Sequence, residues 1–217
     1  MITYHKIETI FKRDEQGTKR LIPFEWRDRT VEFLRDCEWV WTEKVDGTNI
    51  GIYWDGHAVH FQGRTEKANI PKPLLEKLEK LFGGEANEQL FEQLFGEKEV
   101  VLFGEGYGNK IQKCGADYNP NGVDFILFDV YVGGIYLERL NVEDIGRAFS
   151  IDVVPIVGKG TLVEAIHFVQ TEPKSTIGNA MMEGVVARPT VEVKNRKGER
   201  IIVKIKVKDF KGLEVEE

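Results

Sequence analysis

Residues 39–54 read WVWTEKVDGTNIGIYW, and the centre of this stretch, Glu43-Lys44-Val45-Asp46-Gly47-Thr48-Asn49, decides how the chain folds. Aromatic and β-branched residues precede this motif, and an alternating apolar pattern follows it in residues 50–54. Both patterns are typical of β-strands. The stretch therefore predicts that one strand ends and another begins at the glycine turn, with Lys44 held at the junction rather than on a solvated loop.

Lys44 is a candidate nucleophile. A lysine ammonium has no free lone pair, but burial against aromatic neighbours or a nearby cation would lower the pKa and expose the amine. Such an amine can attack a phosphorus atom or a carbonyl carbon. The short pattern Lys-x-Asp-Gly is equally typical of a plain turn with a surface lysine and an Asx cap.

Five further segments stand out along the chain. They are Gly63-Arg64-Thr65, Phe103-Gly104-Glu105-Gly106-Tyr107-Gly108, Phe125-Ile126-Leu127-Phe128-Asp129-Val130, Glu183-Gly184-Val185-Val186-Ala187-Arg188 and Val203-Lys204-Ile205-Lys206-Val207. We call them the Arg64, Glu105, Phe128, Glu183 and Lys204 motifs, and the first stretch the Lys44 motif. Taken singly, each also fits a flexible bend, a buried strand or an ordinary surface charge. Their order and spacing as a set favour a functional interpretation.

The Lys204 motif can be interpreted from its alternation alone. Side chains alternate along a strand, so Lys204, Lys206 and Lys208 are predicted to share one face and the apolar residues the other. Successive ammonium groups on that face lie roughly 7 Å apart, about the spacing of phosphates along a nucleotide chain. Lysines guarding a solvated sheet edge show the same pattern. Basic residues are frequent throughout 194–211, which makes this segment a candidate phosphate track.

Together the six motifs resemble those of the covalent nucleotidyltransferases, which include polynucleotide ligases and mRNA capping enzymes. The resemblance implies that Lys44 becomes joined to AMP or GMP, that Phe128 stacks on the purine, and that Glu105 lies at the sugar. It also implies that Glu183 helps to hold a divalent metal. The predicted catalytic residues are Lys44, Asp46, Lys204 and Lys206. The predicted nucleotide-binding residues are Glu43, Gly47, Asn49, Arg64, Glu105, Phe128, Glu183, Lys204 and Lys206.

The mechanism implied by the resemblance has three steps and uses ATP with Mg²⁺ or Mn²⁺. Lys44 attacks the α-phosphorus of ATP, and pyrophosphate leaves while the metal offsets the charge. AMP then passes to a 5′-phosphate end, and a 3′-hydroxyl displaces it to seal the strand. Lys204 and Lys206 are expected to neutralise phosphate charge, and Asp46 to act as an electrostatic neighbour of Lys44.

Within the family, the sequence is most similar to RNA ligases, in particular RNA-editing ligases and their phage relatives. DNA ligases usually carry an arginine two positions after the motif glycine, where this chain has Asn49. The opening Tyr4-His5-Lys6-Ile7-Glu8 also resembles that branch, whereas Asp46 stands where those enzymes often have histidine. RNA ends are the expected partner, on single strands, a nicked duplex or an RNA–DNA junction.

The overall charge excludes one class of function. The chain has 217 residues, a net charge of −6 and a pI near 5.4, which argues against a non-specific nucleic-acid binder held by bulk charge. No apolar run is long enough to span a membrane and no signal peptide is apparent, so a cytoplasmic protein without a membrane partner is expected. The two cysteines lie in no metal-ligand spacing, and the four histidines are interpreted as structural.

The pattern of elements predicts an α+β fold. Helices are expected at residues 73–82, 85–95, 141–149 and 161–169, the third capped by Asn141 and the last opened by a Thr161–Glu164 capping box. Hairpins are expected to turn at Asp55-Gly56, at Gly133-Gly134 and over residues 195–198. Strands joined mostly by hairpins, with helices outside, give antiparallel sheets. The resemblance implies a ligase-type, ATP-grasp-like arrangement with the nucleotide in a cleft between sheets.

Residues 1–217 are predicted to form a single nucleotidyltransferase domain. The chain ends shortly after the Lys204 motif, where relatives continue into an OB-fold or another C-terminal domain. Three expectations follow: a ligase that works alone, an adenylylation module that needs a partner protein to supply the missing domain, or a truncated chain. An ATP-dependent DNA ligase, a capping guanylyltransferase and a non-catalytic nucleotide or nucleic-acid binder stay open as alternatives.

Overall fold

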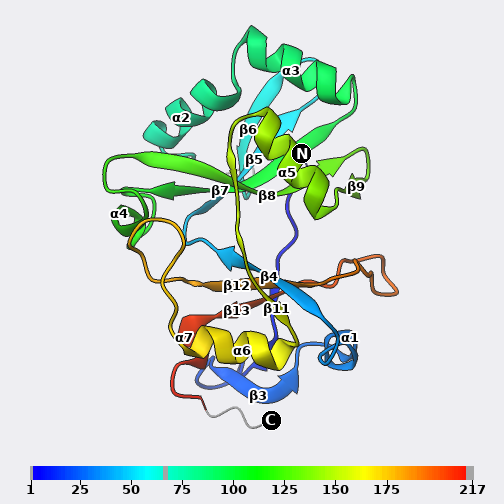
Figure 1. The fold of residues 1–217 in the computed structure, drawn as a ribbon, viewed down its shortest axis with the longest axis vertical. Coiled ribbons are helices and arrows are strands. Elements are labelled where there is room, and N and C mark those ends of the chain that lie inside the picture. The colour runs from blue at the N-terminus through cyan, green and yellow to red at the C-terminus, as the bar shows by residue number, and fades with distance from the viewer. Residues whose placement is uncertain (1, 66–67, 214–217) are drawn as a thin grey trace. The chain divides into compact units, whose positions relative to one another are not determined.

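The computed structural model describes residues 2–65 and 68–213 (Figure 1). The chain divides into two compact units. Unit 1 comprises the described part of Met1–His5 together with Asp46–Val154, and unit 2 comprises Lys6–Val45 together with the described part of Pro155–Glu217. The chain thus passes from unit 2 to unit 1 inside the Lys44 motif, after Val45. That residues 1–217 act as one nucleotidyltransferase domain stays a prediction.

Unit 2 is built on a five-stranded sheet with the strand order β1-β13-β12-β4-β11. These strands are β1 (Glu8–Thr9), β13 (Val203–Lys206), β12 (Gly184–Pro189), β4 (Trp39–Lys44) and β11 (Ile156–Gly160). Neighbours pair antiparallel except β1 and β13, which pair parallel. This order places the strands of the Lys44, Glu183 and Lys204 motifs side by side.

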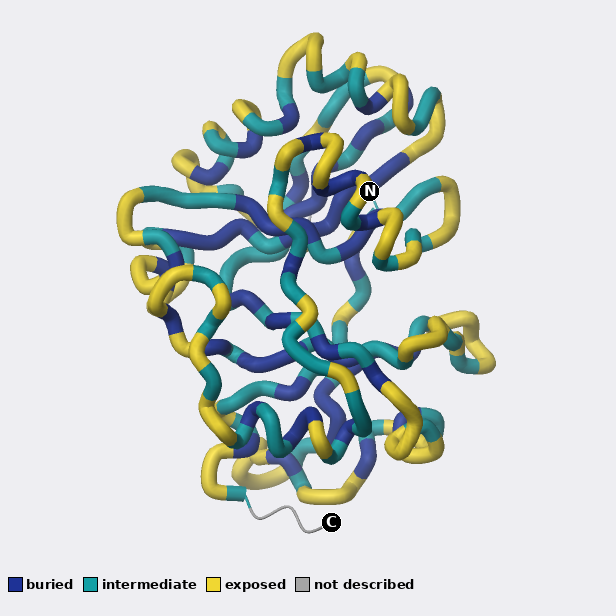
Figure 2. The backbone as a smooth tube through the Cα atoms, viewed as in Figure 1, coloured by how far each residue is buried: buried dark blue, intermediate teal, exposed yellow. Residues whose placement is uncertain are grey.

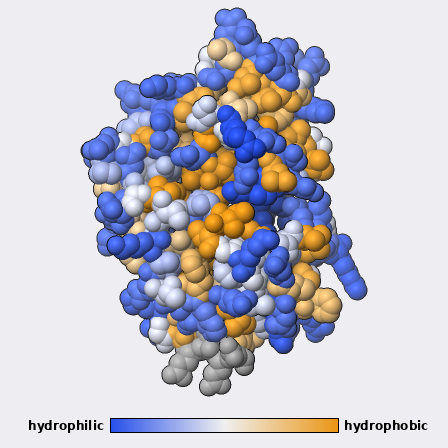
Figure 3. Space-filling view, in the orientation of Figure 1, coloured by the Kyte–Doolittle hydropathy of each residue, from blue (hydrophilic) through white to orange (hydrophobic). Residues whose placement is uncertain are grey.

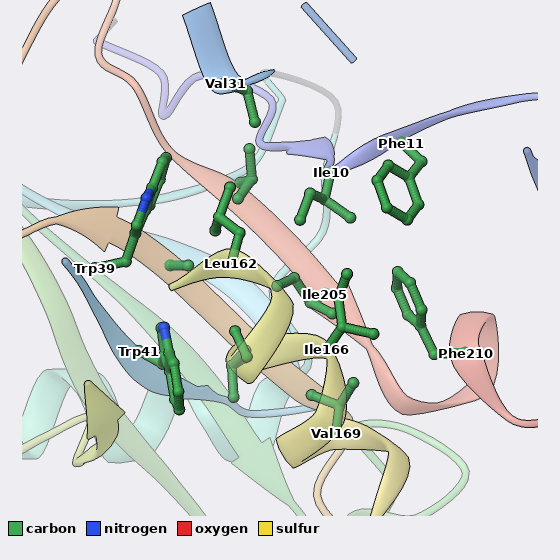
Figure 4. Packing of buried hydrophobic residues seen from close by; sticks show 14 of the residues in the cluster. Ile10, Phe11, Val31, Trp39, Trp41, Leu162, Ile166, Val169, Ile205 and Phe210 are labelled. Atoms are coloured by element: carbon green, nitrogen blue, oxygen red, sulfur yellow. The ribbon is translucent and has the colours of Figure 1, made fainter. Parts of the chain in front are cut away.

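The core of unit 2 lies on one face of this sheet, under α6 (Leu162–Gln170) (Figure 4). Trp39 and Trp41 of β4 point to this face and are buried, while Val40 between them is partly exposed. Full burial of one large apolar side chain stabilises a fold by about 1.5–3 kcal/mol. The smaller elements that complete the unit are β2 (Phe11–Arg13), β3 (Leu21–Trp26), α1 (Arg29–Phe33) and α7 (Val207–Phe210).

The predicted capping box of α6 is confirmed. The Thr161 hydroxyl accepts a hydrogen bond from the Glu164 backbone N–H at 3.2 Å, and the Glu164 carboxylate accepts one from the Thr161 N–H at 2.7 Å. Two N–H groups that the helix leaves unpaired are thereby satisfied. The local sequence alone therefore fixes where this helix begins.

Unit 1 is built on a six-stranded sheet in which β10, β8, β7, β5 and β6 follow one another and β9 pairs with β8. The strands are β10 (Asp152–Val153), β8 (Val123–Val132), β7 (Val100–Gly108), β5 (Thr48–Trp54), β6 (Val59–Gly63) and β9 (Ile135–Tyr136). Only β10 and β8 pair parallel. The strands of the Lys44, Glu105 and Phe128 motifs are therefore neighbours.

Helices pack on one face of the unit 1 sheet. They are α2 (Lys72–Phe82), α3 (Glu85–Phe95) and α5 (Arg139–Ala148), and their buried side chains join those of β5, β7 and β8 in one core. Trp54 stacks on Phe91 of α3 with ring centroids 5.6 Å apart. Figure 2 shows the buried strands and the exposed outer sides of these helices. A short helix, α4 (Gly115–Tyr118), follows β7.

Most helix boundaries match those predicted from the sequence. The prediction for α3 is confirmed at both ends, and α2 begins one residue earlier than predicted. The prediction that Asn141 caps α5 is wrong, because the helix begins at Arg139 and Glu138 occupies the cap position. The Leu137 N–H still pairs with the Val130 carbonyl at 2.8 Å, so the helix starts directly after the sheet contact ends.

The hairpin predictions are confirmed in part. Gly133 and Gly134, with φ of 53° and 103°, form the expected two-residue turn, but β9 pairs over Ile135–Tyr136 only. The turn after Trp54 covers residues 55–58 rather than Asp55-Gly56, because the Asp55 carboxylate accepts hydrogen bonds from the N–H groups of His57 and Ala58, each at 2.8 Å. Residues 195–198 do turn the chain, and their flanks pair through one bridge, Lys194 with Arg200.

The predicted fold class is confirmed as mixed α+β with mainly antiparallel sheets. Among the helices of residues 2–65 and 68–213, none is long and apolar enough to cross a membrane.

Candidate active site

Lys44 and Lys206 lie on either side of Gly184 in the unit 2 sheet. Gly184 of the central strand β12 is the register partner of Lys44 on β4 and of Lys206 on β13. The Cα atoms of Lys44 and Lys206 are therefore two interstrand spacings apart, which is roughly 10 Å. A Cβ atom at Gly184 would lie 2.2 Å from the Ile205 carbonyl oxygen, so the residue between the two lysines has no room for a side chain.

Glu183 connects the two lysines. Its Oε2 atom lies 2.5 Å from the Lys44 Nζ, and its Oε1 atom accepts a hydrogen bond from the Lys206 Nζ. All three side chains are largely buried, with 24%, 16% and 19% of Lys44, Glu183 and Lys206 exposed. Hydrogen bonds between charged partners in such places are stronger than those between neutral groups. We call Lys44, Glu183, Lys204 and Lys206 the lysine centre.

Lys204 is the third cation of the lysine centre. Its register partner on β12 is Val186, whose partner on β4 is Thr42, so Lys204 lies one row away from Lys44 and on the same face as Lys206. Burial lowers the pKa of Lys204, and the charges of Lys206 and Lys44 lower it further against the opposing effect of Glu8. Burial raises the pKa of Glu183, but Lys44 and Lys206 outweigh burial and leave it below its usual value.

The prediction for the face of Lys208 is wrong. Val203 and Ile205 are buried and alternate with the two lysines as expected, but the strand ends at Lys206. Residues from Val207 onward form α7, whose Phe210 is fully buried in the unit 2 core. Burial of this ring favours the helical turn over continuation of the strand, and Lys208 is left exposed.

Glu43 does not join the lysine centre. It alternates with Lys44 along β4 and points to the buried face, where only 2% of the residue is exposed. Its carboxylate accepts hydrogen bonds from the Ser175 hydroxyl, from the Thr176 hydroxyl at 2.6 Å and from the Thr176 N–H at 3.0 Å. Glu43 therefore fastens the segment after α6 to the end of β4. Sequence reasoning missed Ser175 and Thr176, which lie in no recognisable motif.

Gly47 makes a close contact in unit 1. A Cβ atom at this position would lie 2.3 Å from the Gly106 carbonyl oxygen and 2.8 Å from the Glu105 Cγ. The Gly47 carbonyl accepts a hydrogen bond from Gln112 Nε2 at 2.9 Å, and the Asp46 N–H lies 3.4 Å from the Tyr118 hydroxyl. The turn after Lys44 is thus held against β7 and the segment that follows it.

Asn49 and Glu105 are neighbours on the second face of the unit 1 sheet, away from the helices. They are register partners on β5 and β7, and both are partly exposed. Arg64 is exposed and follows Gly63, the register partner of Ile50. The structure therefore brings Gly47, Asn49 and Glu105 together and places Arg64 one residue beyond the end of β6.

Phe128 occupies a β-bulge. Leu127 pairs with Gly104 and Asp129 pairs with Phe103, so Phe128 is the extra residue of β8. Bulges redirect side chains and are frequent next to functional sites. Phe128 is half-buried and its ring lies edge-on to that of Tyr4, with centroids 5.0 Å apart.

Sequence reasoning did not assign roles to Tyr4 and Asp129. The Tyr4 hydroxyl donates a hydrogen bond to Asp129 Oδ2 at 2.8 Å, and Asp129 is fully buried. The Tyr4 ring also contacts Phe103 with centroids 5.0 Å apart, so the N-terminal segment covers this side of the sheet. The available signal was the resemblance of the Tyr4–Glu8 opening to RNA ligases.

The donor set around Glu183 suits a metal that also binds phosphate. Within the described part of the chain, no group of three or more His, Cys, Asp and Glu side chains could hold a metal ion. Mg²⁺ is commonly bound by one or two carboxylates together with substrate phosphates and water. The single carboxylate of this cationic site fits that mode of metal binding. It does not fit a closed cage in which the protein supplies all the metal ligands.

The chain was compared with known proteins. The family model described as RNA ligase matches residues 37–206, a range that contains every predicted site residue. A search of curated protein sequences found no match.

Solved structures of an RNA ligase from Naegleria gruberi have a similar fold. A ligand-free mutant has a TM-score of 0.67 at 18% identity over 96% of this chain and 57% of that one. A mutant with ATP and manganese has a TM-score of 0.66 at 18% identity, over 94% of this chain and 56% of that one. A mutant with AMP and manganese has a TM-score of 0.62 at 17% identity, over 92% of this chain and 59% of that one. The chain thus spans less than two-thirds of the length of these relatives, and the likeness establishes the fold.

Proposed function

The chain belongs to the RNA ligase family, and from this premise we propose that it is an ATP-dependent RNA ligase that works through a lysyl-AMP intermediate on Lys44. AMP would pass from Lys44 to a 5′-phosphate end of RNA, and a 3′-hydroxyl would displace it. Similar structures from Naegleria gruberi that contain ATP or AMP with manganese support the choice of nucleotide and metal.

The lysine centre is the observation that carries the proposal. It holds three lysines and one carboxylate that bonds two of them, a local excess of positive charge in a chain whose net charge is −6. Largely buried cations attract anions more strongly than exposed ones, because water screens them less. A polyphosphate next to the candidate nucleophile is the ligand that this charge fits best.

The first chemical step joins the Lys44 Nζ to the α-phosphorus of ATP. The new N–P bond replaces the P–O bond to pyrophosphate, and Lys44 must give up its proton before it can attack. The Glu183 carboxylate accepts a hydrogen bond from the Lys44 Nζ, with 2.5 Å between Oε2 and Nζ, so it is placed to receive that proton. Lys204 and Lys206 would neutralise the charge that builds on the phosphate oxygens.

Glu183 is the residue that would hold Mg²⁺ or Mn²⁺, directly or through water. When bound, the metal supplies charge that polarises the α-phosphate. The hydrogen bonds that Glu183 makes with Lys44 and Lys206 would keep the carboxylate oriented.

Residues of unit 1 are proposed to bind the rest of the nucleotide. Phe128 would stack on adenine, and Glu105 with Asn49 would bind the sugar. Arg64 would contact the sugar or the 5′-phosphate of the strand, and Asp46 would influence Lys44 through its charge. The close approach of Gly47 to β7 keeps the backbone of this region in place.

Intact-mass spectrometry after incubation with magnesium and ATP tests the proposal. A gain of one AMP is expected for the unsubstituted chain and none for Lys44→Ala. Lys80→Ala, an exposed lysine on α2, is the matched control and should retain the adduct. An adduct that persists in Lys44→Ala, or none in any sample, would contradict the proposal.

A joining assay with labelled RNA separates the finer alternatives. Joining of RNA ends by the purified chain supports a complete ligase, whereas the AMP adduct without joining indicates a module that needs a partner protein. Labelling by GTP instead of ATP would indicate a guanylyltransferase. Nucleotide binding without formation of an adduct would indicate a non-catalytic binder. Joining of DNA ends in preference to RNA ends would overturn the RNA assignment.

A further inference from the structure

Residues 190–200 form an arm that leaves the unit 2 sheet between β12 and β13 (Figure 1). Most of its residues are exposed along the whole length, as Figure 2 shows. The lysine centre lies at one end of the β12–β13 pair, where Gly184 faces Lys206, and the arm leaves from the other end, beyond Ala187 and Val203. The two features thus belong to the same sheet and point away from each other.

The tip of the arm has a defined shape. The Asn195 Oδ1 atom accepts hydrogen bonds from the N–H groups of Lys197 at 2.9 Å and Glu199 at 3.0 Å. Gly198 has a φ of 79°, which glycine adopts without strain, and its N–H donates to the Asn195 carbonyl at 2.9 Å. A tip held in this way presents its side chains at low entropic cost to a ligand.

The two acidic residues of the arm are engaged within it. Glu192 receives two hydrogen bonds from Arg200, at 3.0 and 3.1 Å, and Glu199 accepts one from the Asn195 amide at 2.7 Å. The other three cations of the arm are exposed, and no ion pair joins them to another described residue. They are Lys194, Arg196 and Lys197. Four cations against two acids give the arm a net charge of +2 in a chain of −6.

We propose that this arm binds the phosphate backbone of the polynucleotide at a distance from the lysine centre. The inference rests on the proposed RNA ligase function and adds a second contact with the same substrate. Exposed cations that stand together on an otherwise acidic protein steer and hold phosphate chains. Figure 3 shows mainly hydrophilic residues on the projecting part of unit 2.

The length of the arm limits how long a strand must be to reach from the lysine centre to the tip. Lys206 and Arg196 are ten positions apart in sequence, a length of chain that in extended conformation spans at most about 33 Å. At about 3.4 Å per nucleotide along one strand of a helical duplex, that distance corresponds to about ten nucleotides. A strand that extends about ten nucleotides from the joint is therefore long enough to contact both the lysine centre and the tip.

The test uses the full chain with Lys194, Arg196 and Lys197 all replaced by Gln. Fluorescence anisotropy with a nicked RNA duplex of about 24 base pairs on each side of the nick should show binding weakened about tenfold or more. The slope of log affinity against log salt should become shallower by about 2.7, since three phosphate contacts with a duplex are lost. With only about six base pairs on each side, the variant should bind like the unsubstituted chain.

Two further variants control for general effects of charge. Gln at Lys72, Lys80 and Lys98, three exposed lysines of unit 1, removes the same charge elsewhere and should leave long-duplex binding unchanged. The set Lys194→Arg, Arg196→Lys and Lys197→Arg keeps the charge and should retain binding. Three results would each overturn the inference. The arm variant could bind the long duplex as tightly as the unsubstituted chain, or the unit 1 control could lose as much affinity as the arm variant. The third is that binding by the unsubstituted chain does not depend on salt.

The AMP adduct distinguishes this inference from the proposed function. The arm variant should form the adduct to the same extent as the unsubstituted chain, because its substitutions lie outside the lysine centre. If no adduct forms in either, the proposed function fails. If both form it and both bind long duplexes equally, only the inference about the arm fails.

Discussion

Gly47 lies where an added side chain would have a direct consequence for the fold. Ala at this position would bring its Cβ within 2.3 Å of the Gly106 carbonyl oxygen, which belongs to a central strand and has little freedom to move. Gly47→Ala is expected to cost about 1–3 kcal/mol of stability and to slow AMP-adduct formation. Chemical denaturation and intact-mass time courses would measure the two effects.

Gly122→Ala is the matched control for this substitution. The atom nearest to its added Cβ is 3.9 Å away, so stability and adduct formation should stay close to those of the unsubstituted chain. Equal behaviour of the two alanine variants would show that the close approach at Gly47 is unimportant.

Tyr107 gives the fold a dependence on alkaline pH. Burial, with the charges of Asp124 and Asp152, raises the pKa of Tyr107 to about 12 from a usual value of 10. The folded state therefore keeps this proton at a pH where the unfolded chain loses it, so stability is full below pH 10 and falls as the pH rises from 10 toward 12. The loss attributable to Tyr107 should reach about 1 kcal/mol at pH 11.

Urea denaturation of the unsubstituted chain and Tyr107→Phe at pH 8 and pH 11 tests this dependence. The difference in the free energy of unfolding between the two pH values should be smaller in the variant. Tyr131→Phe, on β8, is a tyrosine control. A loss of stability at pH 11 that is the same in all three proteins would refute the assignment to Tyr107.

At the scale of elements, Glu43 ties the segment after α6 to β4. Removal of its donors by Ser175→Ala with Thr176→Val leaves a buried carboxylate short of partners, which costs about 1–3 kcal/mol for each lost hydrogen bond. Hydrogen exchange of the backbone over residues 174–182 should become faster. Thr171→Val removes an exposed hydroxyl that bonds the Phe168 carbonyl, and exchange in residues 174–182 should then be unchanged.

Elements with local determinants were predictable from the sequence. The capping box of α6 and the apolar periodicity of α3 each depend on residues within the helix, and both predictions are confirmed. The end of β13 depends instead on Phe210, whose ring is buried against side chains distant in sequence such as Phe11. Alternation predicted a strand that continues to Lys208, two residues beyond the end that this packing imposes.

The candidate site likewise contains local features that the sequence predicted and non-local features that it did not. Strand alternation correctly placed Lys204 and Lys206 on one face, because that property is local. The carboxylate that joins Lys44 to Lys206 and the bulge at Phe128 depend on strand register, which a single sequence does not reveal. The tie between Glu43 and Thr176 spans 133 positions and has no local signal at all.

For the whole molecule, the proposal predicts that ATP stabilises the folded chain. In Lys44→Arg, which cannot form the covalent adduct, ATP with magnesium at about 100 times its dissociation constant should add about 2.7 kcal/mol. For a protein of this size the melting temperature should rise by about 5–10 °C. Lys206→Ala and Phe128→Ala in the same background should each reduce the rise, because the proposal assigns both residues to nucleotide binding.

Thermal unfolding followed by circular dichroism, with and without ATP, measures this effect. Lys98→Ala, which replaces an exposed lysine of unit 1, should leave the rise unchanged. An equal rise in every variant would place ATP at some other surface of the molecule.

The distribution of tryptophan between the two cores has an optical consequence. Of the four tryptophans, Trp26, Trp39 and Trp41 are buried in unit 2, while Trp54 is buried in unit 1 against Phe91. Intrinsic fluorescence therefore reports mainly on unit 2. In Trp54→Phe all emission would come from unit 2, and in a chain that keeps Trp54 alone it would come from unit 1. Stopped-flow refolding of this pair of proteins would time the folding of each unit separately.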